Sequence, residues 1–162
     1  MSDASIYSIV KNETQMIHFG EALADACKGG EIIFLHGELG TGKTTLVRGF
    51  MRKLGYKGAV KSPTYTLVEQ YDSQDNTIYH FDLYRLANAE ELEYMGIRDY
   101  FNGSAICLIE WPQQGRGYLP EADVDISIAY SEEGGRQVET QSVSERGVSV
   151  CEKLHGLYSA SL

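Results

Sequence analysis

The segment GELGTGKTT, from Gly37 to Thr45, has the residue types and the spacing of a phosphate-binding loop. It satisfies the pattern G-x-x-x-x-G-K-[ST]. The glycines of the loop allow backbone angles that turn successive N–H groups inward, which makes a nest for phosphate oxygens. The Lys43 ammonium can then reach the β- and γ-phosphates, and the Thr44 hydroxyl can bind Mg²⁺. The residues expected to hold the phosphates are Gly37, Glu38, Leu39, Gly40, Thr41, Gly42, Lys43, Thr44 and Thr45.

A strand and a helix are predicted on the two sides of this loop. The apolar run Ile32 to Leu35 precedes it and is typical of a buried strand, whereas the apolar residues after it recur at helical spacing until Gly55. A helix that begins at the loop adds the positive end of its dipole to the phosphate site. Because the loop pattern alone occurs by chance in many sequences, this strand–loop–helix context is what favours phosphate binding.

Two acidic residues close strand-like segments further along the chain. Glu110 ends the apolar run Ile106 to Ile109, and Asp82 ends the segment IYHFD. A P-loop enzyme needs an acid at the end of a neighbouring strand to hold Mg²⁺ or its water. We therefore expect Thr44 and Glu110 to be the metal ligands, with Asp82 as a candidate for ordering the attacking water or the metal shell. Taken alone, each acid is also compatible with an ordinary strand end or turn.

The rest of the chain predicts elements that surround this centre. Asn12, with Gln15 three residues later, can cap a first helix that ends at Gly29-Gly30. The strand-like segments are AVKSPTYTLVEQYD and TIYHFDLYRL as one hairpin, SAICLIEWP, and VDISIAY and RQVETQSV as a second hairpin. AEELEYMGIRDYF has helical spacing, and residues 144–162 predict a short helix or tail. The expected fold class is α/β and P-loop NTPase-like, a mixed β-sheet flanked by helices, in a single domain over residues 1–162.

Composition limits the partners that this chain can bind. Its 14 Lys and Arg residues are scattered among 23 acidic ones, for a net charge of -9. This field should repel tRNA, so contact with a nucleic acid is expected only through a protein partner. No run approaches the roughly 20 apolar residues that span a bilayer, and the start, MSDASIYSIVKNETQ, lacks a secretory signal pattern. With three well-separated cysteines besides, we expect a cytoplasmic protein with reduced thiols.

Missing motifs narrow the class of nucleotide. A GTPase would be expected to carry NKxD and DxxG, and neither string occurs in the sequence. A small nucleotide kinase usually has a lid with clustered arginines, whereas the arginines of this chain are dispersed. An adenine nucleotide is therefore favoured by elimination.

Three further motifs, together with the loop, carry a resemblance to a known family. SPTYTLVEQY, HFDLYRL and LIEWP, in this order behind GELGTGKTT, resemble the bacterial TsaE (YjeE) family. That family is the ATPase component of the biosynthesis of threonylcarbamoyladenosine (t6A) in tRNA. The resemblance runs from about residue 12 to about residue 143. Glu38 and Thr41 stand where the family often has Asp and Ala, at variable positions of the loop.

The resemblance implies a nucleotide, a metal and partners. Such proteins bind ATP and ADP with Mg²⁺, hydrolyse ATP slowly, and act on a complex of TsaB and TsaD, which transfers threonylcarbamoyl to adenosine 37 of tRNA. It implies Lys43, Asp82 and Glu110 as catalytic residues, with Asp82 ordering the water. The SPT turn, residues 62–64, resembles a switch segment that senses the γ-phosphate. Thr14 matches a position near the base, although a hydroxyl at the start of a helix is equally a cap.

Other readings remain open at this level. The chain could be a nucleotide-gated assembly module that does not require hydrolysis, or a small-molecule P-loop kinase. Trp111, beside Glu110, could pack at the site or meet a partner, although plain packing is the favoured interpretation. The histidines, His80 among them, lack metal-ligand spacing and are not expected to be catalytic.

Overall fold

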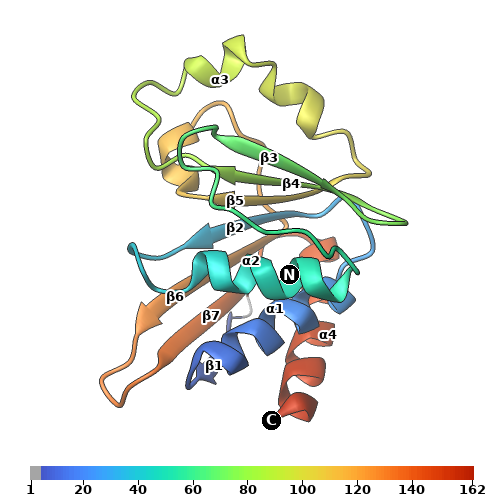
Figure 1. Cartoon of the computed structure of the whole chain (residues 1–162), viewed down its shortest axis with the longest axis vertical. Coiled ribbons are helices and arrows are strands. Elements are labelled where there is room, and N and C mark those ends of the chain that lie inside the picture. Colours follow the sequence, from blue (N-terminus) through green and yellow to red (C-terminus); the bar gives the residue numbers. More distant parts are fainter. Residues whose placement is uncertain (1–4) are drawn as a thin grey trace.

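A β-sheet with helices on both faces organises the computed structural model, which describes residues 5–162 (Figure 1). The first four residues of the predicted domain lie outside the described residues. In chain order the elements are β1 (Ser5–Val10), α1 (Glu13–Ala26), β2 (Ile32–His36), α2 (Lys43–Lys53), β3 (Val68–Asp72), β4 (Thr77–Asp82), α3 (Glu91–Tyr94), the 3₁₀ helix η1 (Ile97–Tyr100), β5 (Ile106–Glu110), the 3₁₀ helix η2 (Pro112–Gly115), β6 (Val124–Tyr130), β7 (Arg136–Ser142) and α4 (Glu145–Ser161).

The sheet is parallel at its centre and antiparallel at its margins. Its order is β1-β7-β6-β2-β5-β4-β3. Strand β2 pairs in parallel with β5 and β6, and β4 pairs in parallel with β5. The pairs β1–β7, β6–β7 and β3–β4 are antiparallel. This arrangement confirms the predicted mixed sheet and both predicted hairpins. It also brings the carboxyl ends of β2, β4 and β5 to one edge, where ligands bind in open α/β sheets.

Each face of the sheet has its own apolar core. One core joins α1, α2 and α4 to the sheet, and the alternate residues Ile78, Ile106 and Leu108 of β4 and β5 belong to it. The other core contains Phe81 and Ile109 with residues from α3 and η1. Because successive strand residues point to opposite faces, Asp82 and Glu110 share a face with the first core, on the side of α2.

Helices α1 and α2 pack at unusually short range. A Cβ atom added to Gly20 of α1 would lie 2.1 Å from the Leu46 carbonyl oxygen. A Cβ atom added to Gly49 of α2 would lie 2.2 Å from the Ile17 carbonyl oxygen. Only glycine fits at either position without moving a backbone, so these two residues set the position of α2 and of the loop that precedes it.

The start of α1 is capped as predicted. The backbone N–H of Gln15 donates to the Asn12 side chain at 2.9 Å, and the Gln15 side chain accepts from the backbone N–H of Lys11 at 2.8 Å. One expectation needs correction, and another is confirmed in the type of element but not in its length. The segment expected as one helix from residue 89 is broken by Gly96, whose φ of 74° ends α3 before η1 begins. The C-terminal segment, expected to be a short helix or tail, is a helix of 17 residues capped by Ser144.

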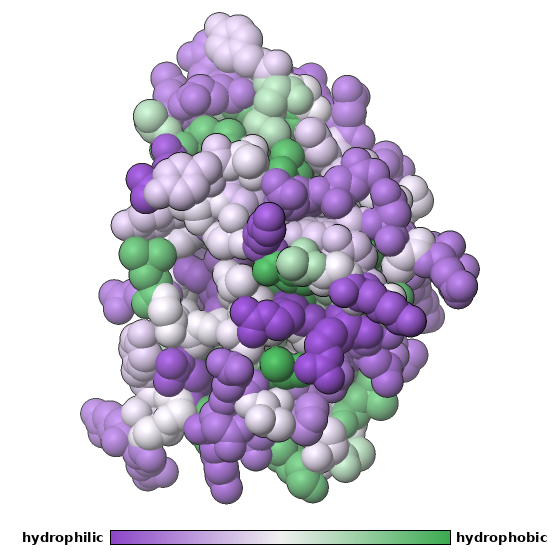
Figure 2. Space-filling model, viewed as in Figure 1, coloured by the Kyte–Doolittle hydropathy of each residue, from purple (hydrophilic) through white to green (hydrophobic). Residues whose placement is uncertain are grey.

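Hydrophilic side chains dominate the face of the molecule seen in Figure 2, where apolar side chains form separate small groups. Large exposed apolar residues include Leu39, at 60% exposure, and Tyr65, at 82%. Leu39 belongs to the glycine-rich loop, and Tyr65 directly follows the SPT turn. Both exposed side chains therefore lie in or next to segments with predicted chemistry. Among the helices of residues 5–162, none has the length and apolar character needed to cross a membrane.

Candidate functional site

The glycine-rich loop connects β2 to α2 and requires glycine at defined positions. Gly40 and Gly42 have φ angles of 81° and 116°, and Gly42 is the residue immediately before α2. A Cβ atom on Gly37, whose φ is 153°, would lie 2.7 Å from Thr41 Oγ1 and 2.9 Å from the Ile128 carbonyl oxygen. A residue with a Cβ atom would be strained at these positive φ angles, whereas glycine is not. The strand–loop–helix context expected from the sequence is therefore present.

Arg136 of β7 braces the loop from the side of the β6–β7 hairpin. Its Nε donates to the Thr41 carbonyl oxygen at 2.8 Å and its Nη2 to the Gly40 carbonyl oxygen at 3.4 Å. The guanidinium carbon lies 4.4 Å from the centroid of the Tyr130 ring. Within the loop itself, the backbone N–H of Thr41 donates to the Glu38 carbonyl oxygen at 3.3 Å, so the backbone at Thr41 is held from two sides. No sequence motif singled out the contacts of Arg136.

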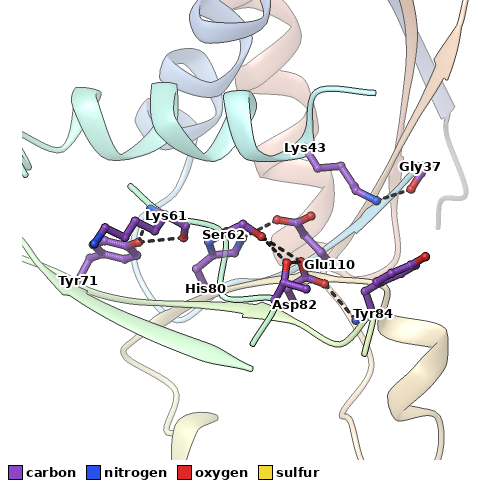
Figure 3. Close-up of polar contacts among 10 residues, drawn as sticks. Gly37, Lys43, Lys61, Ser62, Tyr71, His80, Asp82, Tyr84 and Glu110 are labelled. Carbon is purple, nitrogen blue, oxygen red and sulfur yellow. Dashed lines mark hydrogen bonds and ion pairs between the residues drawn. The ribbon is translucent and has the colours of Figure 1, made fainter. Parts of the chain in front are cut away.

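Asp82 is the last residue of β4, and its carboxylate is hydrogen-bonded to the SPT turn. Its carboxylate accepts from Thr64 Oγ1 at 2.9 Å, from Ser62 Oγ at 3.2 Å and from the backbone N–H of Tyr84 at 3.0 Å (Figure 3). The carboxylate is buried, with only 4% of the residue exposed. The predicted switch segment is thus tied directly to the acid predicted to order the water.

Glu110, at the end of β5, has a different partner. Its Oε2 lies 2.6 Å from Nε2 of His80, two residues before Asp82 on β4 (Figure 3). Glu110 is 3% exposed and His80 is fully buried. No sequence motif predicts a role for His80, because the contact depends on how β4 pairs with β5.

Lys43 begins α2 and is 5% exposed. Its Nζ donates to the Gly37 carbonyl oxygen and lies 4.2 Å from the centroid of the Trp111 ring. Burial lowers the pKa of Lys43 below its ordinary value, while the carboxylates of Glu110 and Asp82 counteract this effect. The positive charge is thus held near two carboxylates and an aromatic face. Trp111 packs at the site, beside the Lys43 ammonium, and not only as an ordinary apolar side chain.

One cavity gathers most of the residues predicted to do chemistry. We call it the phosphate cavity; its volume is about 220 Å³. It is lined by Leu39, Gly40, Gly42, Lys43, Thr44, Thr45, Ser62, Thr64, Asp82, Glu110 and Trp111. Residues from the loop, the SPT turn and the ends of β4 and β5 therefore converge on one space.

A second cavity, the α1 cavity, adjoins the first across the loop. Its volume is about 230 Å³. It is lined by Val10, Lys11, Asn12, Glu13, Met16, Gly40, Thr41, Gly42, Thr45, Gly135 and Arg136. Thr14 is an exposed residue of the first turn of α1, next to the lining residue Glu13. The two cavities together could accommodate a ligand that extends along the loop.

The donor set of the phosphate cavity fits Mg²⁺ bound with a nucleotide. Within residues 5–162 no group of three or more His, Cys, Asp or Glu residues is arranged to hold a metal by itself. Magnesium in nucleotide sites takes one or two protein oxygens and completes its shell with phosphate and water. The Thr44 hydroxyl and the Glu110 carboxylate both line the cavity and are oxygen donors of this kind.

Known proteins are similar to this chain in sequence and in fold. The family model described as "Threonylcarbamoyl adenosine biosynthesis protein TsaE" matches residues 10–138. A relative named tRNA threonylcarbamoyladenosine biosynthesis protein TsaE, from Haemophilus influenzae, is 46% identical over 151 residues, which cover 90% of this chain and 95% of the relative. A protein of the same name from Bacillus subtilis is 35% identical over 127 residues, covering 78% and 79%.

A solved structure supports the same assignment. The crystal structure of YdiB from Bacillus subtilis superposes with a TM-score of 0.83 at 27% identity, covering 96% of this chain and 97% of that one. The match thus covers nearly the whole chain, in agreement with a P-loop NTPase-like fold. With the family model and the curated relatives, it establishes that this chain belongs to the TsaE family.

Proposed function

We propose that this protein is a Mg²⁺-dependent P-loop ATPase. In this proposal it binds ATP and ADP and hydrolyses ATP to support threonylcarbamoyl transfer to adenosine 37 of tRNA by a TsaB–TsaD complex. Membership of a family described by threonylcarbamoyl adenosine biosynthesis supports tRNA modification as the process. Since a tRNA-modifying complex works where tRNA is, the proposed location is the cytoplasm.

The observation that carries the proposal is the convergence of Lys43, Asp82 and Glu110 on the phosphate cavity. A cation at a helix N-terminus, a loop of inward-facing amides and two carboxylates at strand ends are the components that phosphoryl transfer needs. The nucleotide supplies the negative charge that Lys43 and the loop amides would neutralise. The two carboxylates are then available for metal binding and for the water.

Each catalytic residue has a proposed role that matches its contacts. Lys43 binds the β- and γ-phosphates, and Thr44 and Glu110 hold Mg²⁺, which neutralises phosphate charge when bound. Asp82 orients the attacking water, because it lines the cavity while its carboxylate is fixed by the SPT turn. Loss of the γ-phosphate would change the surroundings of Asp82 and therefore of Ser62 and Thr64, which donate hydrogen bonds to it. The SPT turn could act as a switch in this way.

The α1 cavity is the proposed site of the adenosine part of the nucleotide. It shares Gly40, Gly42 and Thr45 with the phosphate cavity, so a phosphate chain along the loop leads into it. The base would lie between the start of α1 and Arg136. Thr14 stays a prediction as a base contact, to be tested by its substitution with alanine.

Contact with tRNA is proposed to be indirect, through TsaB and TsaD. The net charge of -9 opposes direct binding of a polyanion. The phosphate cavity, as lined by residues of the described part of the chain, contains Lys43 but no arginine. A partner that covers the exposed Leu39 and Tyr65 beside this cavity could supply a further positive charge, so the isolated protein should hydrolyse ATP slowly.

The test is the rate of ATP hydrolysis by the isolated protein, with and without TsaB, TsaD and tRNA. We expect a slow Mg²⁺-dependent rate that the partner proteins raise. An unchanged rate would remove partner completion from the proposal. Failure to detect Mg²⁺-dependent binding of ATP or ADP by calorimetry would remove the ATPase assignment itself.

The contact between Asp82 and the SPT turn, which is followed by the exposed Tyr65, also favours a second function, a module whose nucleotide occupancy controls assembly without hydrolysis. The two functions differ in what a hydrolysis-deficient variant does. The assembly module would still support tRNA modification, whereas the ATPase would not. A small-molecule kinase, the third reading, would consume ATP only with an added hydroxyl acceptor and yield a phosphorylated product.

A further inference from the structure

His80 and Glu110 form a buried polar pair beside the phosphate cavity. In the register of the parallel strands, Asp82 lies opposite Glu110 and His80 lies opposite Leu108. His80 therefore shares the face of Asp82 and Glu110 but lies deeper in the sheet. Its ring reaches diagonally across to Glu110, with 2.6 Å between Nε2 and Oε2 (Figure 3).

The proposed function gives this contact a direction. A Glu110 side chain that binds Mg²⁺ is ionised and only accepts hydrogen bonds, so in that state Nε2 of His80 is the donor. The other ring nitrogen, Nδ1, is buried without a hydrogen-bond partner among the described residues. The polar interaction of the ring is thus directed at Glu110.

Burying a histidine at this position costs free energy that an apolar side chain would not cost, so packing alone does not explain it. His80 is 0% exposed, and an apolar ring in its place would avoid the desolvation of two nitrogens. What a histidine adds at this position is one short hydrogen bond that fixes Oε2 of Glu110. The second oxygen of the same carboxylate, Oε1, is then the one available to a ligand in the cavity.

We propose that His80 is a positioning residue that sets the affinity of the site for Mg²⁺ by holding the Glu110 carboxylate. The inference rests on the proposed function, in which Glu110 binds the metal. Hydrogen-bond partners of metal-binding side chains typically change metal affinity by about 10–100-fold when they are removed. We expect a loss of this size when the bond from His80 is broken.

Two substitutions of His80 test whether the hydrogen bond to Glu110 matters, because both place a polar amide of similar size at this position but only one can reach Glu110. In His80→Gln the amide nitrogen reaches about as far as Nε2, whereas in His80→Asn the same amide is one carbon shorter and falls short of Glu110. Mg²⁺ is titrated by calorimetry into each protein saturated with ADP, and ADP affinity is also measured in EDTA. Circular dichroism and thermal unfolding report whether each variant is folded.

We expect His80→Asn to bind Mg²⁺ about 10–100-fold more weakly, and His80→Gln to bind it within about threefold of the parent protein. ADP affinity in EDTA should be the same for all three proteins, because the bond acts on the metal ligand and not on the loop. Equal Mg²⁺ affinities for Asn and Gln variants, whether both high or both low, would overturn the inference.

A second background tests whether His80 acts through Glu110. In Glu110→Ala protein, adding His80→Asn should leave the remaining Mg²⁺ affinity unchanged, and a further drop would assign His80 a merely structural role. The same series distinguishes the inference from the proposed function. If the parent protein binds ADP without any dependence on Mg²⁺, the proposed function fails; if the parent depends on Mg²⁺ and the variants do not differ, only the role of His80 fails.

Discussion

Asp82 and Glu110 occupy directly paired positions at the ends of β4 and β5, yet their carboxylates are bound to different parts of the molecule. Asp82 accepts hydrogen bonds from the partly buried SPT turn, whereas Glu110 is bound to His80 inside the sheet. A carboxylate fixed by a buried strand residue suits a metal ligand, because its position does not change with the loop. A carboxylate fixed by a loop suits a group that responds to the γ-phosphate.

Conservative amide substitutions should separate these two roles. We expect Asp82→Asn to keep Mg²⁺-dependent ATP binding but to lose hydrolysis by about 100-fold, the size of effect typical when a reacting group such as the attacking water is misplaced. Glu110→Gln should also keep ATP binding in EDTA but should bind Mg²⁺ much more weakly, with Thr44 as the remaining protein ligand. Both variants should fail to support tRNA modification in a reconstituted assay.

Asp72→Asn is the matched control for these variants. Asp72 lies on β3, is exposed, and pairs with Gln70 and Thr77 away from the phosphate cavity. Its substitution should change neither binding nor hydrolysis. If Asp82→Asn and Glu110→Gln abolish hydrolysis while tRNA modification continues, the protein is an assembly module and not a required ATPase.

The bond between Thr64 and Asp82 predicts that the SPT turn affects hydrolysis more than binding. Thr64→Val keeps the shape of the side chain and removes the hydroxyl that donates to Asp82 at 2.9 Å. We expect about a 10-fold lower rate of ATP hydrolysis, since a hydrogen bond to a charged group contributes about 1.5–3 kcal/mol. Rates and ATP affinities measured on the same preparation would check this.

Thr66→Val provides the comparison within the same segment. The Thr66 hydroxyl donates to Glu69 at 2.9 Å and has no contact with Asp82 among those formed by the described residues. The Thr66→Val protein should hydrolyse ATP at the parent rate. An equal loss in both variants would mean that the segment matters through its conformation, and that the Asp82 contact is not the cause.

Local patterns were enough to predict the main groups of the site. The loop with Lys43 and the acids Asp82 and Glu110 are recognisable because each lies at a strand end or helix start that its neighbours in sequence define. His80 and Arg136 could not be found in this way. Their contacts depend on the pairing of β4 with β5 and on the position of the β6–β7 hairpin beside the loop.

The fold shows the same division. Both hairpins, the cap at Asn12 and the strand before the loop are encoded by local residue patterns, and all are present. The order of the strands, and with it the pairing of β1 with β7, follows from tertiary packing that a local pattern does not contain. The apolar spacing of residues 89–101 predicts one helix because it continues across Gly96, whose left-handed backbone ends α3.

Arg136 predicts a contribution to nucleotide affinity from outside the recognised motifs. Arg136→Met removes the donors to Thr41 and Gly40 while keeping most of the aliphatic chain. We expect ADP affinity to fall by about 10-fold, the equivalent of one net hydrogen bond of about 1.4 kcal/mol. Arg98→Met, which removes an exposed arginine paired with Glu93, is the control and should bind ADP normally.

Arg136→Lys tests the reason for this loss. Lysine keeps the charge but replaces the planar donor set by a single ammonium, which cannot span two carbonyl oxygens in the same way. An affinity between those of the parent and Arg136→Met is expected. Full affinity in the lysine variant would show that charge beside the nucleotide, and not the brace on the loop, is what Arg136 contributes.

The close approach of α1 and α2 predicts that alanine destabilises the protein at positions where it would normally strengthen a helix. Gly20→Ala places a methyl group 2.1 Å from the Leu46 carbonyl oxygen, and Gly49→Ala places one 2.2 Å from that of Ile17. Overpacking of this kind costs about 1–3 kcal/mol of the free energy of unfolding. Urea denaturation should show a lower midpoint for each variant.

Gly156→Ala gives the opposite prediction from the same substitution. Gly156 lies within α4, is exposed, and has open space where a Cβ atom would be added. Alanine there should raise the free energy of unfolding by about 0.5–1 kcal/mol, because glycine weakens a helix interior by that amount. Since all three variants share the helix-propensity gain, the difference between Gly156→Ala and the other two measures the helix contact alone. If Gly20→Ala and Gly49→Ala stabilise the protein as Gly156→Ala does, the two helices can separate at little cost, and their glycines do not position the loop.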